Sequence, residues 1–370
     1  QGTVCDVFDE KKLNTLKGTI SLGHNRYSTT GSSSSKNIQP FYVKHKGKSL
    51  VVAHNGNFVN TAALHKALEK DGAIFQTTMD SEIVLHLIAK SKKKELPDVI
   101  VDALSRIRGS YSMLLYVNDT LIAARDPLGF RPMCLGRKEN AWIVCSETCA
   151  LDIIGARYVR DVEPGEILFF RKGEEPLSIK PFDEKRRAHC IFEYIYFSRP
   201  DSNIFGHNVY KVRKALGERL ADEAPVKADF VMPVPDSGNM AALGFSERAG
   251  IKFEQAIVRN HYIGRTFIQP SQGIRDFRVR IKLNPINDVI KDKDVVVVDD
   301  SIVRGTTSRA RVRTIRDAGA KSIHMRISCP PITCPCFYGV DFPTKRELIA
   351  SCNKIEEIRK FIDSDTLSYL

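Results

Sequence analysis

The sequence lacks several features that mark particular classes of protein. No apolar run approaches the length that spans a bilayer, and Gln1–Ile20 lacks the basic start and apolar core of a secretory signal. No repeat of fixed period is visible, and the only low-complexity stretch is Ser32–Ser35. Membrane-spanning, secreted and repeat proteins are therefore disfavoured, and we expect a cytoplasmic protein with no membrane partner.

The cysteines do not form the dense, regular framework of a small secreted domain. There are nine of them, an odd number, scattered along the chain. We expect most of them to be reduced thiols, and a metal site is the alternative for some of them. The spacing of Cys329, Cys334 and Cys336 fits no common zinc pattern, so packing is the simpler interpretation for Cys329, Cys334 and Cys352.

Basic residues exceed acidic ones, 56 against 44, which gives a formal net charge of +12. An excess of this kind suits an anionic partner such as nucleic acid, an acidic membrane or a phosphorylated small molecule. The basic residues are spread along the chain, and the one dense run, Lys90–Lys94, is typical of a polar helix end. We therefore expect no nucleic-acid partner.

The chain of 370 residues is long enough for two domains of ordinary size. Residues 1–180 show short strand-like runs and two segments of helical spacing, Asn60–Asp71 and Asp80–Lys90. This mixture predicts an α+β domain of stacked antiparallel sheets flanked by helices. In residues 181–370 strands alternate with helices, which predicts an α/β domain with a parallel sheet. The polar segment Arg171–Arg187 is expected to connect the domains.

A candidate phosphate-binding loop follows the four consecutive valines Val295–Val298, which predict a strand buried on both faces. Asp299 and Asp300 stand at the carboxyl end of this strand, where parallel sheets bind their ligands. A loop rich in Gly, Ser and Thr that opens a helix offers backbone N–H groups and a positive dipole to a phosphate. The loop residues expected to bind the phosphate are Ser301, Ile302, Val303, Arg304, Gly305 and Thr306. An ordinary strand end followed by a helix cap is the simpler alternative.

The full segment VVVVDDSIVRGTTS resembles the fingerprint of type I phosphoribosyltransferases. The resemblance implies that Asp299 and Asp300 bind the ribose hydroxyls of 5-phosphoribosyl pyrophosphate and that the loop binds its 5-phosphate. The upstream loop Pro233–Gly238 also ends a strand and opens a helix, so we expect it to face the same crevice. There Ser237, with Asp299 and Asp300, is a candidate to hold Mg²⁺, and Asp236 could also reach the metal or the pyrophosphate. A turn followed by a helix cap is the alternative interpretation of this loop.

A basic stretch follows this upstream loop along the chain. It begins at Arg259 and includes Arg265, and both are candidates to bind the pyrophosphate. An ordinary solvated loop is the alternative interpretation.

Polar groups follow apolar runs at three places in the first domain, residues 24–31, 53–57 and 77–82. The side chain of Arg26 could clamp a carboxylate, and Asp80 could bind an ammonium group. The Asn55 side chain and the Gly56 N–H could form an oxyanion hole. Each group taken alone has a structural alternative, and we expect His24 and His54 to be packed or turn histidines.

Together, and in this order, the three motifs resemble the glutaminase domain of N-terminal-nucleophile amidotransferases. The resemblance implies that Arg26, Thr29 and Asp80 bind glutamine. Because these motifs stand in front of a segment that resembles a phosphoribosyltransferase domain, the resemblance narrows to the amidophosphoribosyltransferase family. It covers essentially the whole chain. That family implies that ammonia from glutamine displaces pyrophosphate to give 5-phosphoribosylamine, the first step of purine synthesis. It also implies a homo-oligomer, dimer or tetramer, with purine nucleotides as feedback inhibitors.

Two departures from the family pattern concern cysteines. The family's nucleophile is a cysteine at the mature N-terminus, whereas residue 1 is Gln and Cys5 lies in a different context. We therefore expect the nucleophile among residues that precede Gln1. Cys190, just before an expected strand at 191–197, and Cys336 match two of the four cysteines that ligate a [4Fe–4S] cluster in one branch of the family. The other two are expected beyond Leu370.

Two competing functions fit parts of the sequence. A catalytically silent regulator could bind phosphoribosyl pyrophosphate or nucleotides without turnover, and the intact Asp299–Asp300 loop argues against it. A salvage phosphoribosyltransferase that attaches a base would not need the motifs of the first domain.

A glutaminase assay on the chain from Gln1 to Leu370 tests the position of the nucleophile. We expect no hydrolysis of glutamine, because a thiol or hydroxyl with an adjacent base is needed for the acyl transfer. We expect pyrophosphate release with free ammonia to persist. Measurable glutamine hydrolysis by this chain would show that the nucleophile lies within it.

Overall fold

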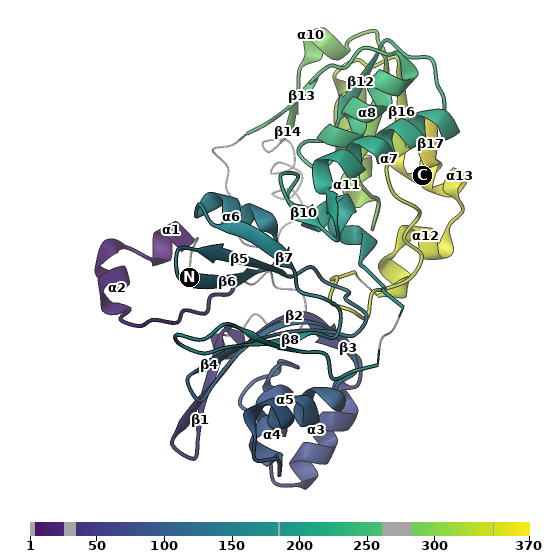
Figure 1. Ribbon diagram of the computed structural model, residues 1–370. Coiled ribbons are helices and arrows are strands. Elements are labelled where there is room, and N and C mark those ends of the chain that lie inside the picture. Colours follow the sequence, from purple (N-terminus) through teal and green to yellow (C-terminus); the bar gives the residue numbers. More distant parts are fainter. Residues whose placement is uncertain (1–3, 26–34, 184–185, 261–282, 343) are drawn as a thin grey trace. The chain divides into compact units, whose positions relative to one another are not determined.

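The computed structural model describes residues 4–25, 35–183, 186–260, 283–342 and 344–370, and divides the chain into two compact units (Figure 1). The first unit comprises Gln1–Gly129 and Glu163–Arg187, and the second comprises Phe130–Val162 and Ala188–Leu370. The division predicted at residue 180 differs from this one, because residues 130–162 group with the second unit.

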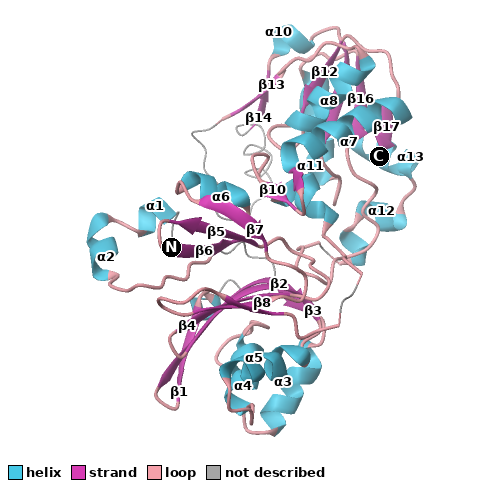
Figure 2. Ribbon diagram, in the orientation of Figure 1, coloured by secondary structure: helices cyan, strands magenta, loops and turns pink. Residues whose placement is uncertain are grey.

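The first unit is built on a six-stranded antiparallel sheet in the order β1-β2-β3-β4-β8-β9. The strands are β1 (Phe41–His45), β2 (Lys48–Phe58), β3 (Gly109–Val117), β4 (Thr120–Arg125), β8 (Ile167–Phe170) and β9 (Leu177–Ile179). Three helices, α3 (Thr61–Lys70), α4 (Glu82–Lys90) and α5 (Leu96–Ser105), lie against one face of it and share its apolar core (Figure 2). Two short helices, α1 (Val4–Val7) and α2 (Glu10–Thr15), precede the sheet.

Two details of this unit differ from the sequence-based expectations. The segment Arg171–Arg187 was predicted to connect domains, but β9 within it pairs with β8 as the edge strand of the sheet. Helix α5 was not predicted, although Pro97 in its first turn and apolar residues at helical spacing mark it. The two helices that were predicted, α3 and α4, are confirmed to within two residues at each end.

The second unit contains a three-stranded antiparallel sheet in the order β6-β5-β7. Its strands are β5 (Cys134–Lys138), β6 (Ala141–Cys145) and β7 (Arg157–Asp161), and helix α6 (Thr148–Ile153) connects β6 to β7. Leu151 of α6 packs so closely on β5 that a Cβ at Gly136 would lie 2.4 Å from a Leu151 methyl carbon. The glycine therefore lets the helix sit directly on the sheet.

The same unit contains the predicted parallel sheet, in the order β12-β15-β16-β17 (Figure 1). Its strands are β12 (Phe230–Pro233), β15 (Asp294–Asp299), β16 (Ser322–Ile327) and β17 (Thr366–Tyr369). The main helices are α7 (Val209–Glu223), α8 (Asn239–Ala249), α11 (Thr306–Asp317) and α13 (Ile355–Ile362). The alternation of strands and helices read from the sequence is thus confirmed.

The remaining elements of this unit are short. They are β10 (Asn203–Ile204), β11 (His207–Asn208), β13 (Ile257–Arg259), β14 (Leu283–Pro285), α10 (Asn287–Ile290) and α12 (Ile349–Cys352). Residues 191–197 were expected to form a strand, but Glu193–Phe197 is a helical turn. The buried carboxylate of Glu193 explains the difference, because it accepts a hydrogen bond from the Ser198 hydroxyl at 2.7 Å and so folds the segment back on itself.

Strand β15 is buried on both faces, as its valines predict. Val295 and Val297 join one apolar core with residues of α11 and α13. Val296 and Val298 join a second core with residues of α7 and α8. Because successive side chains of a strand point to opposite faces, helices on both sides of the sheet hold this strand in place.

Helices α7 and α8 touch backbone to backbone. A Cβ at Gly217 of α7 would lie 1.9 Å from the Ala241 carbonyl oxygen, and one at Gly244 of α8 would lie 2.0 Å from the Lys214 carbonyl oxygen. No side chain fits at either position, so the pair packs more tightly than ordinary helices do.

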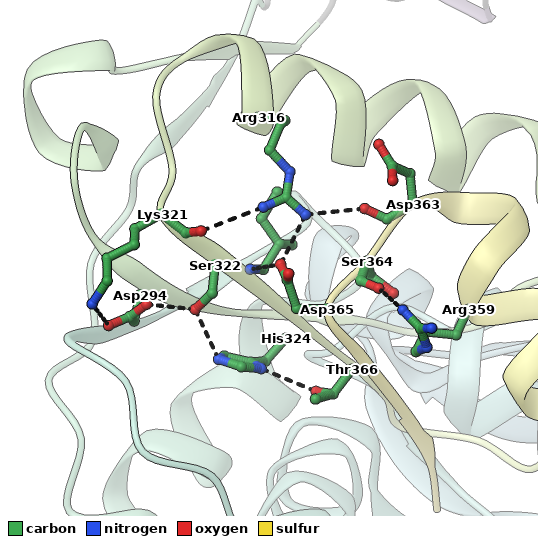
Figure 3. A network of polar contacts seen from close by, with 11 residues as sticks. Asp294, Arg316, Lys321, Ser322, His324, Arg359, Asp363, Ser364, Asp365 and Thr366 are labelled. Carbon is green, nitrogen blue, oxygen red and sulfur yellow. Dashed lines mark hydrogen bonds and ion pairs between the residues drawn. The ribbon is translucent and has the colours of Figure 1, made fainter.

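A polar network occupies the amino ends of the parallel strands (Figure 3). Asp294 of β15 accepts hydrogen bonds from Ser322 at 2.6 Å and Lys321 at 3.0 Å. His324 bridges the hydroxyls of Ser322, at 3.0 Å, and Thr366, at 3.1 Å. These contacts tie β15, β16 and β17 together at the edge opposite the candidate phosphate loop.

The described residues contain no helix that is both long and apolar enough to cross a membrane.

The α7–α8 contact can be tested with Gly217→Ala. We expect the free energy of unfolding to fall by about 1 to 3 kcal/mol, because the added methyl group overpacks a backbone contact. Lys211→Ala, at an exposed position of the same helix, should change it by less than about 0.5 kcal/mol. Chemical denaturation followed by circular dichroism measures both, and equal effects would contradict the close contact.

Candidate functional site

The two loops predicted to share a crevice begin at the same edge of the parallel sheet. Pro233 of β12 pairs with Val298 of β15, so the chain leaves both strands side by side at their carboxyl ends. The Ser237 hydroxyl of the first loop donates a hydrogen bond to Asp300 Oδ1 of the second at 2.6 Å. The structure thus brings Ser237 together with the paired aspartates.

Asp299 is almost fully enclosed at the end of β15. Its Oδ2 accepts a hydrogen bond from Arg311 of α11 at 2.6 Å, and its Oδ1 accepts one from the Asp300 N–H at 3.0 Å. Burial raises the pKa of Asp299 to about 7, Arg311 opposes that rise, and the neighbouring charge of Asp300 adds to it. Two carboxylates that are adjacent in sequence therefore have unlike environments.

Asp300 lies closer to the loop surface and is surrounded by hydroxyl groups. Ser237 donates to its Oδ1, and Ser301 donates to its Oδ2 at 2.5 Å. Each carboxylate oxygen can accept more than one hydrogen bond, so both keep capacity for a ligand. A set of hard oxygen donors of this kind fits Mg²⁺, directly or through water, and also fits sugar hydroxyls.

The loop between β15 and α11 is anchored by one buried side chain and one backbone hydrogen bond. Ile302 is buried in the core, and Val303 accepts a backbone hydrogen bond from Ile349 at 2.9 Å. Gly305 has φ +74° and stands at the N-cap of α11, where a Cβ would lie 2.7 Å from Ile349. The first N–H groups of α11, from Thr306 onward, have no intrahelical acceptor and carry the positive end of the helix dipole. An anion such as a phosphate fits this position.

Two ion pairs involve arginines of the candidate loops and of the basic stretch. Arg304 forms an exposed ion pair with Glu347 at 3.1 Å. Arg259 at the end of β13 forms an ion pair with Asp236 of the upstream loop. Arg265, the other predicted pyrophosphate ligand, lies outside the described residues.

Two arginines near the aspartates were not predicted from the sequence. Arg311 binds Asp299, and Arg213 of α7 is buried with its Nη2 2.8 Å from the Ser198 carbonyl oxygen. Burial lowers the pKa of Arg213. The negative charge of Asp300 makes the largest of the contributions that act to raise it. Both arginines lie in helices rich in basic residues, so their sequence context matches an exposed charged surface.

In the first unit, the motif at residues 53–57 forms the end of β2. Gly56 has φ +148°, and a Cβ there would lie 2.1 Å from the Ser110 carbonyl oxygen. His54 is buried, as predicted, with its Nε2 3.1 Å from that same carbonyl oxygen and its ring stacked on Phe58. Only glycine fits at position 56. Asn55 is half-buried beside it, whereas Arg26 and Thr29 lie outside the described residues.

Asp80 lies next to this strand end and is engaged on both oxygens. Its Oδ1 is 3.4 Å from His54 Nδ1, and its Oδ2 accepts the Phe58 N–H at 2.9 Å. Burial disfavours the ionised form of Asp80, but His54 and the Phe58 N–H outweigh it and hold the pKa below its usual value of 3.8. The carboxylate thus fixes the end of β2 and carries the negative charge that an ammonium group would meet.

The other residues of the motif at 77–82 hold the loop in place. Glu82 accepts the Gln76 N–H and the Thr77 N–H, each at 2.8 Å, and Asn37 bonds to both the backbone and the side chain of Thr78. These contacts position Asp80 at the start of α4.

Cys190 and Cys336, the predicted cluster ligands, line one cavity of about 350 Å³ in the second unit, and Cys329 lines the same cavity. Cys336 Sγ accepts the Tyr338 N–H at 3.2 Å, and burial raises the pKa of Cys190. Among the described residues no group of three or more His, Cys, Asp or Glu side chains could hold a metal ion. Two thiols that line one cavity fit part of a cluster site but do not complete one.

Known proteins match both units. A family model described as a glutamine amidotransferase domain matches residues 24–152. A glutamine phosphoribosylpyrophosphate amidotransferase from B. subtilis, solved with ADP and GMP, superposes with a TM-score of 0.88 at 48% identity, covering 94% of this chain and 75% of that one. A structure described as the allosteric regulatory enzyme of purine biosynthesis gives 0.89 at 49% identity, with the same coverage. The fold is that of the glutamine phosphoribosylpyrophosphate amidotransferases.

Curated relatives narrow the class. The chain is 52% identical to a chloroplastic amidophosphoribosyltransferase of Glycine max and 48% identical to the amidophosphoribosyltransferase of Methanocaldococcus jannaschii, over its full length in both cases. It spans 65% of the first and 82% of the second. The chain belongs to the amidophosphoribosyltransferase family.

The contacts of Asp80 can be tested with Asp80→Asn. We expect the free energy of unfolding at neutral pH to fall by about 1.5 to 3 kcal/mol, because charged hydrogen-bond contacts are lost. A carboxyl with a lowered pKa contributes stability above about pH 4 and loses it as the pH falls through the folded-state pKa, so the difference should shrink in acid. Glu95→Gln, at an exposed position of the same unit, is the control and should show neither effect.

Proposed function

We propose that this protein transfers ammonia derived from glutamine to C1 of 5-phosphoribosyl pyrophosphate, giving 5-phosphoribosylamine, pyrophosphate and glutamate. The observation that carries the proposal is the hydrogen bond from the Ser237 hydroxyl to Asp300 Oδ1, which brings the two loops together at the carboxyl edge of the parallel sheet. Membership of the amidophosphoribosyltransferase family supports the same reaction. The product would enter purine synthesis as its first intermediate.

In this reaction the protein holds the sugar and its phosphates. Asp299 and Asp300 would accept hydrogen bonds from the ribose hydroxyls, while the first turn of α11 would bind the 5-phosphate. Displacement at C1 passes through a cationic, oxocarbenium-like state, so a fixed geometry and exclusion of water supply much of the catalysis. Arg259, and Arg265 by its place in the sequence, would bind the departing pyrophosphate.

The glutaminase half would provide the ammonia. Asp80 would bind the α-ammonium group of glutamine, and Arg26 and Thr29 would bind its carboxylate end. Asn55 and the Gly56 N–H would form the oxyanion hole, consistent with the absence of space for a side chain at position 56.

Two metal groups belong to the proposal. Mg²⁺, held by Ser237, Asp299 and Asp300, would neutralise charge on the pyrophosphate. A [4Fe–4S] cluster is proposed at Cys190 and Cys336, with further ligands from outside the described residues.

Partners and location are also proposals. Purine nucleotides are proposed as feedback inhibitors, and the B. subtilis relative, solved as a complex with ADP and GMP, supports nucleotide binding. A homo-oligomer, dimer or tetramer, and a cytoplasmic location stay predictions. Nothing in the comparisons favours a catalytically silent regulator.

The reaction can be tested with Asp300→Ala and an assay of ammonia-dependent pyrophosphate release. We expect a loss of at least about 100-fold, since a group that positions the reacting sugar is removed. Asp288→Ala, an exposed aspartate of the same unit, should retain full activity. Unchanged activity in Asp300→Ala, with the fold intact by circular dichroism, would rule out this site.

A further inference from the structure

Three cysteines gather at the open end of the β5–β6 hairpin, Cys134, Cys145 and Cys149. Cys134 of β5 and Cys145 of β6 are directly paired across the strands, and their sulfur atoms lie 3.4 Å apart. Cys149 of α6 lies near, with its sulfur 4.0 Å from a carboxylate oxygen of Glu147. All three are free thiols in this structure.

The cross-strand position suits a disulfide. Residues directly opposite each other in an antiparallel pair have Cα atoms about 4.5 to 5.5 Å apart. Disulfides join Cα atoms about 4.4 to 6.8 Å apart, so the backbone spacing already satisfies the bond. Only a small movement of the sulfur atoms separates the observed pair from a bonded one.

The two sulfurs differ in the way that an attacking and a resolving thiol must. Cys134 is buried, with 2% of its surface exposed, whereas Cys145 is only partly buried. The hydrogen bond between them raises the pKa of Cys134 and lowers that of Cys145. Cys145 is therefore the more accessible thiol and the one that ionises more readily.

We propose that Cys134 and Cys145 form a reversible disulfide, which makes the β5–β6 hairpin a site of oxidative modification. The oxidant is a small-molecule disulfide. The Cys145 thiolate attacks one of its sulfurs and releases the other as a thiolate. The Cys134 thiolate then attacks the Cys145 sulfur of the mixed disulfide and releases the second half as a thiolate. The protein loses two thiol protons, and the small disulfide is reduced to two thiols.

The site is connected to a neighbouring segment through Glu147, two residues beyond Cys145. A Glu147 carboxylate oxygen accepts the Arg199 N–H and the Ser202 hydroxyl, each at 2.8 Å. The Cys145 thiol donates a hydrogen bond to the Glu147 carbonyl oxygen at 3.3 Å, and formation of the disulfide removes that thiol proton. Oxidation should therefore weaken these contacts and expose the Arg199 amide to exchange with solvent.

The hairpin contains its own reporter. Trp142, the single tryptophan of the chain, lies on β6 beneath the guanidinium of Arg137 at 4.8 Å. A change of hairpin geometry should alter its fluorescence, and no other tryptophan interferes.

The test is titration of the reduced protein with oxidised glutathione. Three readouts apply: peptide mass spectrometry, Trp142 fluorescence, and hydrogen exchange of the 199–203 segment. We expect a Cys134–Cys145 cross-linked peptide, a fluorescence change reversed by dithiothreitol, and faster exchange at Arg199. None of these depends on catalytic activity, so their failure is distinct from failure of the proposed reaction.

Matched variants complete the test. Cys134→Ser and Cys134→Ala should leave a stable mixed disulfide on Cys145, and Cys145→Ser should abolish both products. Cys352→Ser, at an exposed cysteine elsewhere, should behave as wild type. A persistent mixed disulfide on Cys145 of the wild type, or a cross-link from Cys145 to Cys149, would overturn the proposal.

Discussion

The candidate phosphoribosyl site depends on the burial of one strand, β15, between two apolar cores. Its valines alternate between a core shared with α11 and α13 and a core shared with α7 and α8. A shift of one residue along the strand would exchange the two sets of side chains, so the register is strongly fixed. Asp299 and Asp300 follow the last valine directly, and their position is therefore set by packing rather than by the loop itself.

Arginines from two helices then organise the charge around this strand end. Arg311 donates a hydrogen bond to Asp299, and the negative charge of Asp300 acts to raise the pKa of Arg213. Elsewhere in the unit the buried Arg131 pairs with Glu193 at 2.5 Å and also donates to the Gly339 carbonyl oxygen at 2.9 Å. A buried charge without such partners would be costly. These pairs therefore constrain the segments that carry them, and they leave Asp300, with its hydroxyl neighbours, as the more accessible carboxylate.

The sequence could predict the features that depend on local pattern. Four consecutive valines indicated a doubly buried strand, and alternating strands and helices indicated the parallel sheet. It could not predict contacts between distant segments, such as the pairing of Arg311 with Asp299 or the burial of Glu193 that turns an apparent strand into a helical turn. The grouping of residues 130–162 with the second unit likewise depends on packing that no short motif records. Residues Arg26, Thr29 and Arg265 were named from motifs alone.

The glycine contact between α7 and α8 has a mechanical consequence. Where side chains separate two helices, one helix can slide by changing rotamers, but a backbone-to-backbone contact has no such layer to yield. The two helices should therefore move together as one rigid body. The loop that carries Ser237 leads directly into α8, and Arg213 sits on α7. A ligand that displaces this loop would thus shift a buried positive charge beside Asp300, without any side chain between them having to rearrange.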